Sequence, residues 1–183
     1  RIAPGWAPTA EAIYTAMDAR RYVAIGSTQE KSTGWVEPRG EAHAPLLEQV
    51  AGQIIMKLMI ETKSVPGATV REKAQAEADH IEQTTGRKPG KKEMRELRED
   101  ALLSLLPQAF PKKSAVWVWI DTHAGLLCVD ASSQGKIDEV ITSLVQTFEG
   151  LALHQVQTHT TPATAMACGR LHQPIWDQTS TAC

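Results

Sequence analysis

Two segments of this chain alternate apolar and polar residues with a period of two, and this alternation limits its fold more than any other feature. The segments are 49–63 and 116–121. Successive side chains of a strand point to opposite faces, so the pattern predicts strands that each bury one face. The second segment also places Trp117 and Trp119 together on its other face. The apolar residues predicted to share one face are Ile54, Met56, Leu58 and Ile60 in the first segment, and Val116, Val118 and Ile120 in the second.

Other segments have the apolar spacing of three and four residues that predicts amphipathic helices. These helices are expected at 10–17, 70–84, 91–106 and 137–148. Thr9 precedes the first helix as an N-cap, Gly86 ends the second, and Pro107 ends the third. The second and third helices are close in sequence and therefore predict a helical hairpin.

The remaining segments complete an α+β pattern. Residues 122–125 predict a turn and 126–131 a return strand, while 151–157 predicts a further strand. Residues 26–40 are rich in Gly, Pro and Ser, which predicts a loop with at most a short extended piece around Trp35. The order predicts antiparallel sheets with packed helices and a protruding helical hairpin. We expect four parts: an N-terminal α/β part at 1–63, a helical hairpin with a basic tip at 64–113, a hairpin-helix-strand part at 114–167, and an irregular tail at 168–183.

Charge is distributed unevenly along the chain. The formal net charge is −2, yet segment 86–113 holds eight basic and four acidic residues, which leaves eleven basic against seventeen acidic residues elsewhere. This asymmetry predicts a cationic surface for a polyanion. The candidate phosphate contacts are Arg87, Lys88, Lys91, Lys92, Arg95, Arg98, Lys112 and Lys113.

This basic segment has two interpretations. It is a solvated helical face if pairs such as Lys92 with Glu96 form at i, i+4, since such pairs contribute only a few tenths of a kcal/mol. It is a phosphate-binding ridge if the cations of the Gly/Pro turn, which have no acidic neighbour before Glu93, are free.

Phe110 also has two interpretations. It lies between Pro107 and Pro111 and directly before Lys112 and Lys113. A core anchor that holds the helix end is one hypothesis. An exposed apolar wedge that stacks on a base or enters a partner's pocket is the other.

Catalysis and metal binding are not supported by any motif. The set His154, His159, Cys168 and His172 has ligand types that suit zinc but lacks a paired CxxC, so we reject a metal site. Asp121, His123 and Asp130 cluster around one predicted hairpin, where capping of the turn is the simpler explanation. Cys128 falls in the predicted return strand and is expected to act as a small hydrophobe. We therefore predict no catalytic residue, no metal and no cofactor.

The apolar runs, the N-terminal residues and the cysteine count together predict the cellular location. The longest apolar run, 54–60, is too short to span a membrane, and no secretory leader precedes Pro4. The chain's odd number of cysteines argues against a disulfide framework. These features predict a cytoplasmic fragment that does not enter the membrane.

Several blocks of sequence, in order and spacing, resemble the bacterial RdgC family of recombination-associated proteins. The blocks are Thr33-Gly34-Trp35-Val36, Gly52-Gln53-Ile54, Gly86-Arg87-Lys88, the run from Leu103 to Phe110, Trp119-Ile120-Asp121, Gly125-Leu126 and Val129-Asp130. The resemblance covers about 1–167, somewhat more than the first half of that family's chain.

The resemblance implies a nucleoid protein that binds double- and single-stranded DNA with little sequence preference. It also implies a restraint of the RecA recombinase, action at replication forks, and horseshoe-shaped subunits that pair at both ends into a homodimeric ring around duplex DNA. Carried onto this chain, it makes Arg87 and Lys88 the first phosphate contacts, with Lys91 and Lys92 beside them, and places Phe110 at DNA or at a subunit contact.

The chain departs from the family pattern at both ends. The family's opening methionine and first strand are reduced to Arg1-Ile2, and residues 168–183 match nothing in the family pattern, as a shifted reading frame or an appended tail would. Ring closure by this chain is therefore in question. Two alternatives stay open: a protein-interaction or dimerisation module without DNA contact, and a truncated product without function.

Overall fold

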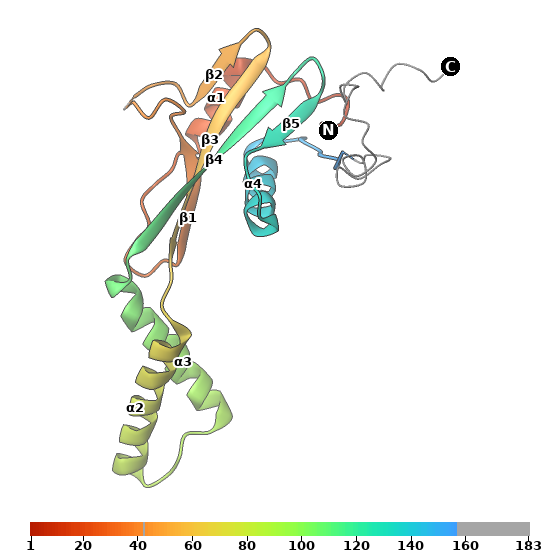
Figure 1. Cartoon of the computed structure of the whole chain (residues 1–183). Helices are drawn as coiled ribbons and strands as arrows, with labels where there is room; N and C mark the ends of the chain where they lie inside the picture. Colours follow the sequence, from red (N-terminus) through yellow and green to blue (C-terminus); the bar gives the residue numbers. More distant parts are fainter. Residues whose placement is uncertain (42, 157–183) are drawn as a thin grey trace, which may run out of the picture.

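The computed structural model describes residues 1–41 and 43–156, which form an antiparallel sheet, two helices packed on it and a long helical hairpin (Figure 1). All strand pairs are antiparallel, in the order β1-β3-β4-β5, and β2 also pairs with β3. The strands are β1 (Lys31–Val36), β2 (Leu47–Val50), β3 (Gln53–Lys63), β4 (Pro111–Asp121) and β5 (Leu126–Val129). The predicted α+β class is confirmed.

The described residues also form four α-helices and one 3₁₀ helix. Helix α1 begins where Thr9 Oγ1 accepts a hydrogen bond from the N–H of Ala12, the predicted N-cap. No helix in residues 1–41 and 43–156 is long and apolar enough to cross a membrane. The helices are α1 (Ala10–Asp18), α2 (Gly67–Thr85), α3 (Lys91–Leu105), η1 (Leu106–Gln108) and α4 (Gln134–Thr147).

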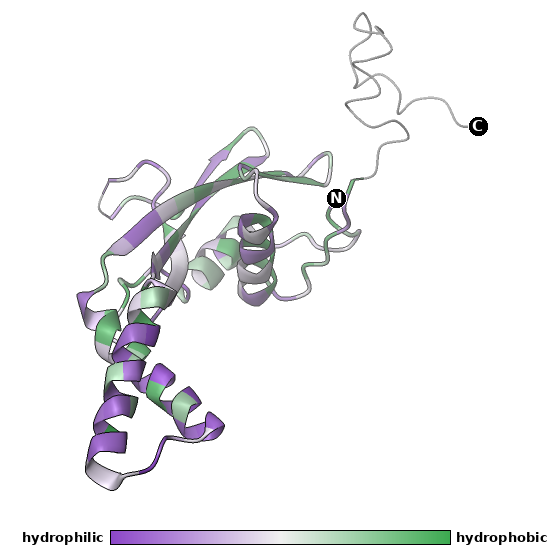
Figure 2. Cartoon of the chain, turned by 60° about the horizontal axis from the view of Figure 1, so that its bottom comes forward, coloured by the Kyte–Doolittle hydropathy of each residue, from purple (hydrophilic) through white to green (hydrophobic). Residues whose placement is uncertain are grey.

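The core lies between one face of the sheet and helices α1 and α4 (Figure 2). Every second residue from Ile54 to Ile60 in β3 and from Val116 to Ile120 in β4 faces this core, and these are the residues predicted to share a face. Trp35 of β1 is 1% exposed, and its indole N–H donates to Thr147 Oγ1 of α4 at 2.9 Å, so the one polar atom of this ring is satisfied.

The opposite face of the sheet is covered by residues 22–25 at Glu61, but it is open around the tryptophans of β4. Trp117 and Trp119 are 39% and 48% exposed on it, and Lys57 Nζ lies 4.8 Å from the Trp117 ring centroid. Cys128 pairs with Trp119 across β4 and β5 and is exposed as well. The prediction that Cys128 acts as a small buried hydrophobe is therefore wrong, because period two turns it to the outer face while Leu127 and Val129 join the core.

Residues 26–40 contain a six-residue strand rather than a loop with a short extended piece. Strand β1 forms because β3 supplies a complete antiparallel partner for it, and such tertiary pairing overrides weak local propensity. Gly34 is required there, since a Cβ would lie 2.4 Å from Cα of Tyr22, in a segment that runs beside β1.

The predicted strand at 49–63 is interrupted near its start. Ala51 and Gly52 have φ angles of 48° and 79°, which make a tight turn between β2 and β3. The phase of the alternation changes across this turn, because Leu47 packs against the core with Ile54 and Met56 while Val50 is exposed.

The predicted strand at 151–157 is wrong for the part that the structure describes. Only Leu153 forms a bridge, with Ile2. Pairing stops after Ala3 because Pro4 has no N–H and Gly5 turns the chain away with a φ of 100°.

Candidate nucleic-acid interface

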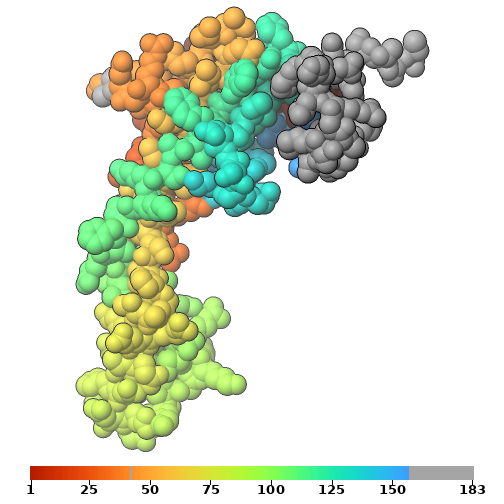
Figure 3. Space-filling view, viewed as in Figure 1, coloured from red at the N-terminus to blue at the C-terminus, as the bar shows by residue number. Residues whose placement is uncertain are grey.

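The α2–α3 hairpin extends away from the sheet as an arm (Figures 1 and 3). It is inserted between β3 and β4, which pair in register up to Lys63 and Pro111. Its outer surface is mostly hydrophilic (Figure 2). Small residues hold the two helices together, because those buried between them are Ala74, Ala78 and Ala101. The sequence therefore places its basic segment on the part of the molecule that extends furthest from the core.

A tight connection forms the tip of the hairpin. Gly86 adopts a φ of 73° and its N–H donates to Glu82 O at 2.8 Å, which ends α2 as predicted. At the start of α3, the Glu93 carboxylate accepts from the N–H of Gly90 at 3.4 Å. Both helix ends are thus satisfied within a short turn.

Glu93 also binds Arg87. The guanidinium donates through Nη1 and Nη2 to the two carboxylate oxygens at 2.9 and 3.2 Å. This hydrogen bond with Arg87 is the main reason why the pKa of Glu93 lies below its ordinary value. Arg87 is therefore not a free cation, although its side chain is 63% exposed.

Most of the other predicted contacts are also paired. Lys88 lies 3.7 Å from Glu82, Lys92 lies 3.9 Å from Glu96, and Arg95 lies 2.9 Å from Glu99. The expectation that the tip cations lack acidic neighbours is wrong for Arg87 and Lys88, because the turn brings the end of α2 and the start of α3 together, and with them Glu82 and Glu93. Exposed pairs of this kind contribute about 0–1 kcal/mol, so a phosphate can replace the carboxylate at small cost.

Three of the predicted contacts form no ion pair within residues 1–41 and 43–156. They are Lys91, Arg98 and Lys112. Lys91 lies in the first turn of α3, and Arg98 lies two turns further along the same side. Lys91, Arg95 and Arg98 therefore form a ridge along α3, which we call the α3 ridge.

Lys112 and Lys113 do not belong to the hairpin. They lie in β4, where successive residues point to opposite faces, so they cannot act as one patch. Lys113 Nζ lies 3.8 Å from Glu61 and 5.6 Å from the Tyr22 ring centroid. The eight predicted residues thus divide into a tip, the α3 ridge and two separate strand positions.

Phe110 is 92% exposed, between η1 and β4. It does not anchor the core of the described chain, because Leu106 fills the buried position at the end of the helical region with 1% exposure. An exposed phenylalanine beside two lysines remains a candidate contact.

One further cation was missed by sequence reasoning. Arg71 lies at the base of α2, outside the basic segment, and lines the same hollow as Arg98. It is brought there by the antiparallel return of α3. The only sequence signal for Arg71 was the predicted helical hairpin, because two antiparallel helices place the start of α2 beside the end of α3.

The polar residues around the β4–β5 turn play a structural part. Asp121 Oδ1 accepts from the N–H groups of His123 and Ala124, both at 2.9 Å, and these bonds lower the pKa of Asp121, with that from Ala124 the strongest cause. The capping interpretation is confirmed for Asp121. Of the rejected metal set, His159, Cys168 and His172 lie outside the described residues, as does the predicted tail at 168–183.

Fold and site together define an α+β protein that carries a charged helical arm between two strands of its sheet. The family model described as "Putative exonuclease, RdgC" matches residues 1–169. The chain belongs to the RdgC family.

Curated relatives carry the name "Recombination-associated protein RdgC". The protein from Herminiimonas arsenicoxydans is 37% identical over 166 residues, which is 91% of this chain and 55% of the relative. Those from Janthinobacterium sp. (strain Marseille) and Bordetella pertussis are 34% and 35% identical over the same shares. This chain thus spans about half the length of the curated relatives it matches. The resemblance to the RdgC family that the sequence indicates is confirmed.

Proposed function

We propose that this chain binds DNA without sequence preference, through contacts between the helical arm and the phosphate backbone. The observation that carries the proposal is the set of exposed cations at the tip and along the α3 ridge. The arm that carries them stands clear of the sheet (Figure 3). Lys91 and Arg98 supply charge that no carboxylate of the described chain neutralises. Arg87, Lys88, Lys92 and Arg95 supply charge whose exposed partners exchange readily.

Such contacts read no bases, because an arm that offers only side-chain cations neutralises phosphates of any sequence. Double- and single-stranded DNA are both suitable ligands. We assign no reaction and no cofactor to the site, so its task is binding rather than catalysis. The description of the family model includes an exonuclease, and a nuclease assay with labelled DNA tests whether this chain has that activity.

The biological setting follows from the family. We propose that the chain acts in the cytoplasm at the nucleoid and at replication forks, where DNA coated by such a protein is less open to RecA. Within a homodimeric ring the arm would contribute part of the lining. The whole relatives are longer than this chain, so ring formation is a property to be measured on it.

A salt-dependent titration tests the proposal. Fluorescence anisotropy of a labelled duplex should give a log K that falls with log salt by about 0.9 for each phosphate contact. Lys91→Gln and Arg98→Gln should each reduce that slope by about one contact. Arg20→Gln is the matched control, since Arg20 is an exposed arginine outside the arm whose side chain donates to Gln146 Oε1 at 3.2 Å. Binding that is indifferent to both salt and these substitutions would contradict the proposal.

A second candidate function is dimerisation through Phe110. At 92% exposure its ring offers apolar area that a second copy of the chain could bury. Phe110→Ala should lower the mass measured by light scattering while Lys91→Gln leaves it unchanged. If Phe110→Ala weakens DNA binding and not self-association, the side chain contacts DNA instead.

A further inference from the structure

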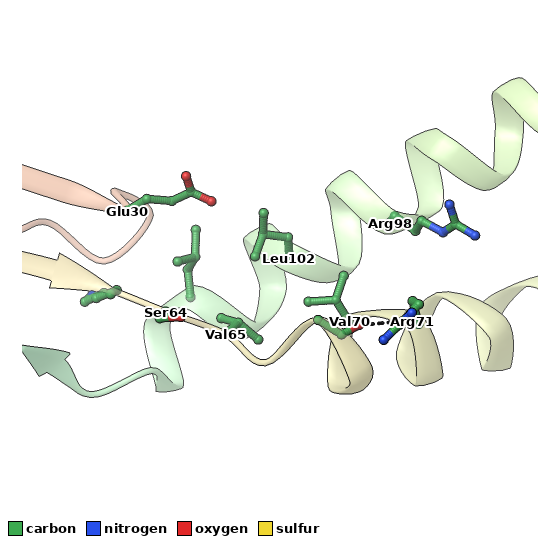
Figure 4. Close-up of a pocket in the computed structure, with 10 residues that line it drawn as sticks. Glu30, Ser64, Val65, Val70, Arg71, Arg98 and Leu102 are labelled. Carbon is green, nitrogen blue, oxygen red and sulfur yellow. Dashed lines mark hydrogen bonds between the residues drawn. The ribbon is translucent and has the colours of Figure 1, made fainter. Parts of the chain in front are cut away.

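A hollow of about 740 Å³ lies where the helical arm joins the sheet (Figure 4). Residues from α2, α3, the end of β3 and the linker to α2 line it. Its volume lies in the range of sites that take small ligands or a few side chains. The hollow is separate from the tip of the arm, and Arg98 is the residue that it shares with the α3 ridge.

The lining of the hollow is apolar on the side of the two helices. Val70 of α2 and Leu102 of α3 both line the hollow, one from each helix of the arm (Figure 4). Val65 of the linker and the buried Leu106 continue this apolar surface. Together they form a surface that an apolar side chain can cover.

Two arginines stand beside this apolar surface, one from each helix. Arg71 donates through Nε to Gly67 O at 3.0 Å, which fixes its direction and leaves the terminal nitrogens available. Neither Arg71 nor Arg98 forms an ion pair with a carboxylate among residues 1–41 and 43–156. Guanidinium groups bind carboxylates through paired hydrogen bonds.

An acid marks the other end of the hollow. Glu30 lies toward the sheet, whereas Arg71 and Arg98 lie toward the arm (Figure 4). Lys63, the third cation of the lining, is held by the carbonyl oxygens of Gly26 and Ser27. The hollow is therefore polarised, with its available positive charge at the arm end.

We propose that this hollow docks a short acidic segment of a partner protein. One apolar side chain of that segment covers Val70 and Leu102, and its carboxylates bind Arg71 and Arg98. A phosphate backbone matches the arginines but leaves the apolar lining uncovered, and its further charges meet Glu30. The proposal does not rest on DNA binding by the arm, because Arg71 lies outside the proposed DNA contacts.

The probe is a fluorescein-labelled acidic peptide, Glu-Glu-Leu-Glu-Glu, titrated with the full chain by anisotropy. Arg71→Gln and Arg98→Lys should each weaken its binding by about fivefold to tenfold, as loss of a charge-assisted bond predicts. Replacing the peptide's leucine by serine should weaken binding by a similar factor. Arg95→Gln, on the same helix but outside the hollow, should leave peptide binding unchanged while it weakens DNA binding.

Three results would overturn the proposal. The first is no saturable binding of the peptide, and the second is equal binding of the leucine and serine peptides. The third is displacement of the peptide by a short duplex together with weaker duplex binding by Arg71→Gln, which would assign the hollow to nucleic acid. Circular dichroism of Arg71→Gln and Arg98→Lys confirms that each variant is folded. If the chain does not bind DNA but still binds the peptide, the proposed function fails and the proposal for the hollow stands.

Discussion

Glu61 is a carboxylate with 2% exposure at the end of a core strand, and its surroundings explain why it is tolerated. The Tyr22 O–H donates to it at 2.5 Å and the Ile25 N–H at 2.8 Å. Lys113 Nζ lies 3.8 Å away on β4. These contacts tie residues 22–25 to the sheet, and they satisfy a charge that would otherwise be costly to bury.

The Tyr22–Glu61 pair makes stability depend on pH in two windows. Burial first, and then the bond to Glu61, raise the pKa of Tyr22 from 10.0 to about 12. The hydrogen bond from Tyr22 holds the pKa of Glu61 below its ordinary 4.5. The raised pKa stabilises the fold below pH 10, and this contribution is lost as pH rises toward 12. The lowered pKa stabilises the fold above pH 4.5, and this contribution is lost as pH falls through the folded value.

The corresponding test is Tyr22→Phe, followed by urea unfolding across pH. The variant should have a lower midpoint at pH 7 and a smaller fall in midpoint between pH 10 and 12 than the parent. Tyr14→Phe, at an exposed tyrosine of α1, serves as the matched control and should keep the parent profile. If the urea midpoint of Tyr22→Phe falls between pH 10 and 12 as much as that of the parent, ionisation of Tyr22 is not the cause of the alkaline loss of stability.

Glu93 limits the charge that the tip can offer to DNA. Because it binds Arg87 through both carboxylate oxygens, Glu93→Gln should release the guanidinium and remove a repulsive charge. We expect DNA affinity to rise by about 1.5-fold to 5-fold, the range that an exposed pair of about 0.2–1 kcal/mol allows. The glutamine can still accept from the N–H of Gly90, so the start of α3 is preserved. Affinity that stays equal or falls would mean that Arg87 does not contact phosphate.

At the scale of elements, the arm is far less well packed than the sheet. The residues buried along α2 and α3 are alanines, whereas the core between sheet and helices contains tryptophan, leucine, isoleucine and methionine. Little apolar area holds the two helices of the arm together, so the arm should open locally without unfolding of the sheet. Amides of α2 and α3 should therefore exchange faster than those of β3 and β4.

Gly86→Ala tests this independence. Its φ of 73° is strained for alanine, and no atom lies within 4 Å of an added Cβ, so backbone strain is the only effect. We expect a loss of about 1 kcal/mol in the stability of the arm. Hydrogen exchange followed by mass spectrometry should show faster exchange in α2 and α3 alone. Faster exchange in β3 as well would mean that arm and sheet unfold together.

Sequence reasoning succeeded where one physical signal dominates. Period two fixed the buried faces of β3 and β4, and helix ends such as Gly86 were found because their chemistry is local. It failed where partners distant in sequence decide, as for β1, which forms on the edge of β3. The site followed the same division: the basic residues were found by counting charge, but their pairing with Glu82 and Glu93 depends on how the two helices meet.

At the scale of the whole molecule, the arm is an insertion into a β-hairpin. Strands β3 and β4 pair along their full length, and the last pair is Lys63 with Pro111. The chain leaves the sheet after Lys63, forms the arm, and re-enters the sheet at Pro111. The sheet and its two covering helices thus form a closed unit around their own core, and the arm adds surface rather than core.

Excision of the arm separates folding from binding. Replacing residues 64–110 by Asn-Gly would join β3 to β4 through a two-residue turn that suits antiparallel strands. We expect a cooperative melt, near-ultraviolet circular dichroism typical of a buried Trp35, and DNA affinity at least tenfold lower, because phosphate contacts dominate such binding. The control keeps the arm but carries glutamine at Lys91, Arg95 and Arg98, and should lose affinity in the same direction. If the excised protein folds and binds DNA as well as the parent, the contacts lie on the sheet, where Lys112, Lys113 and Lys57 would be the first to replace.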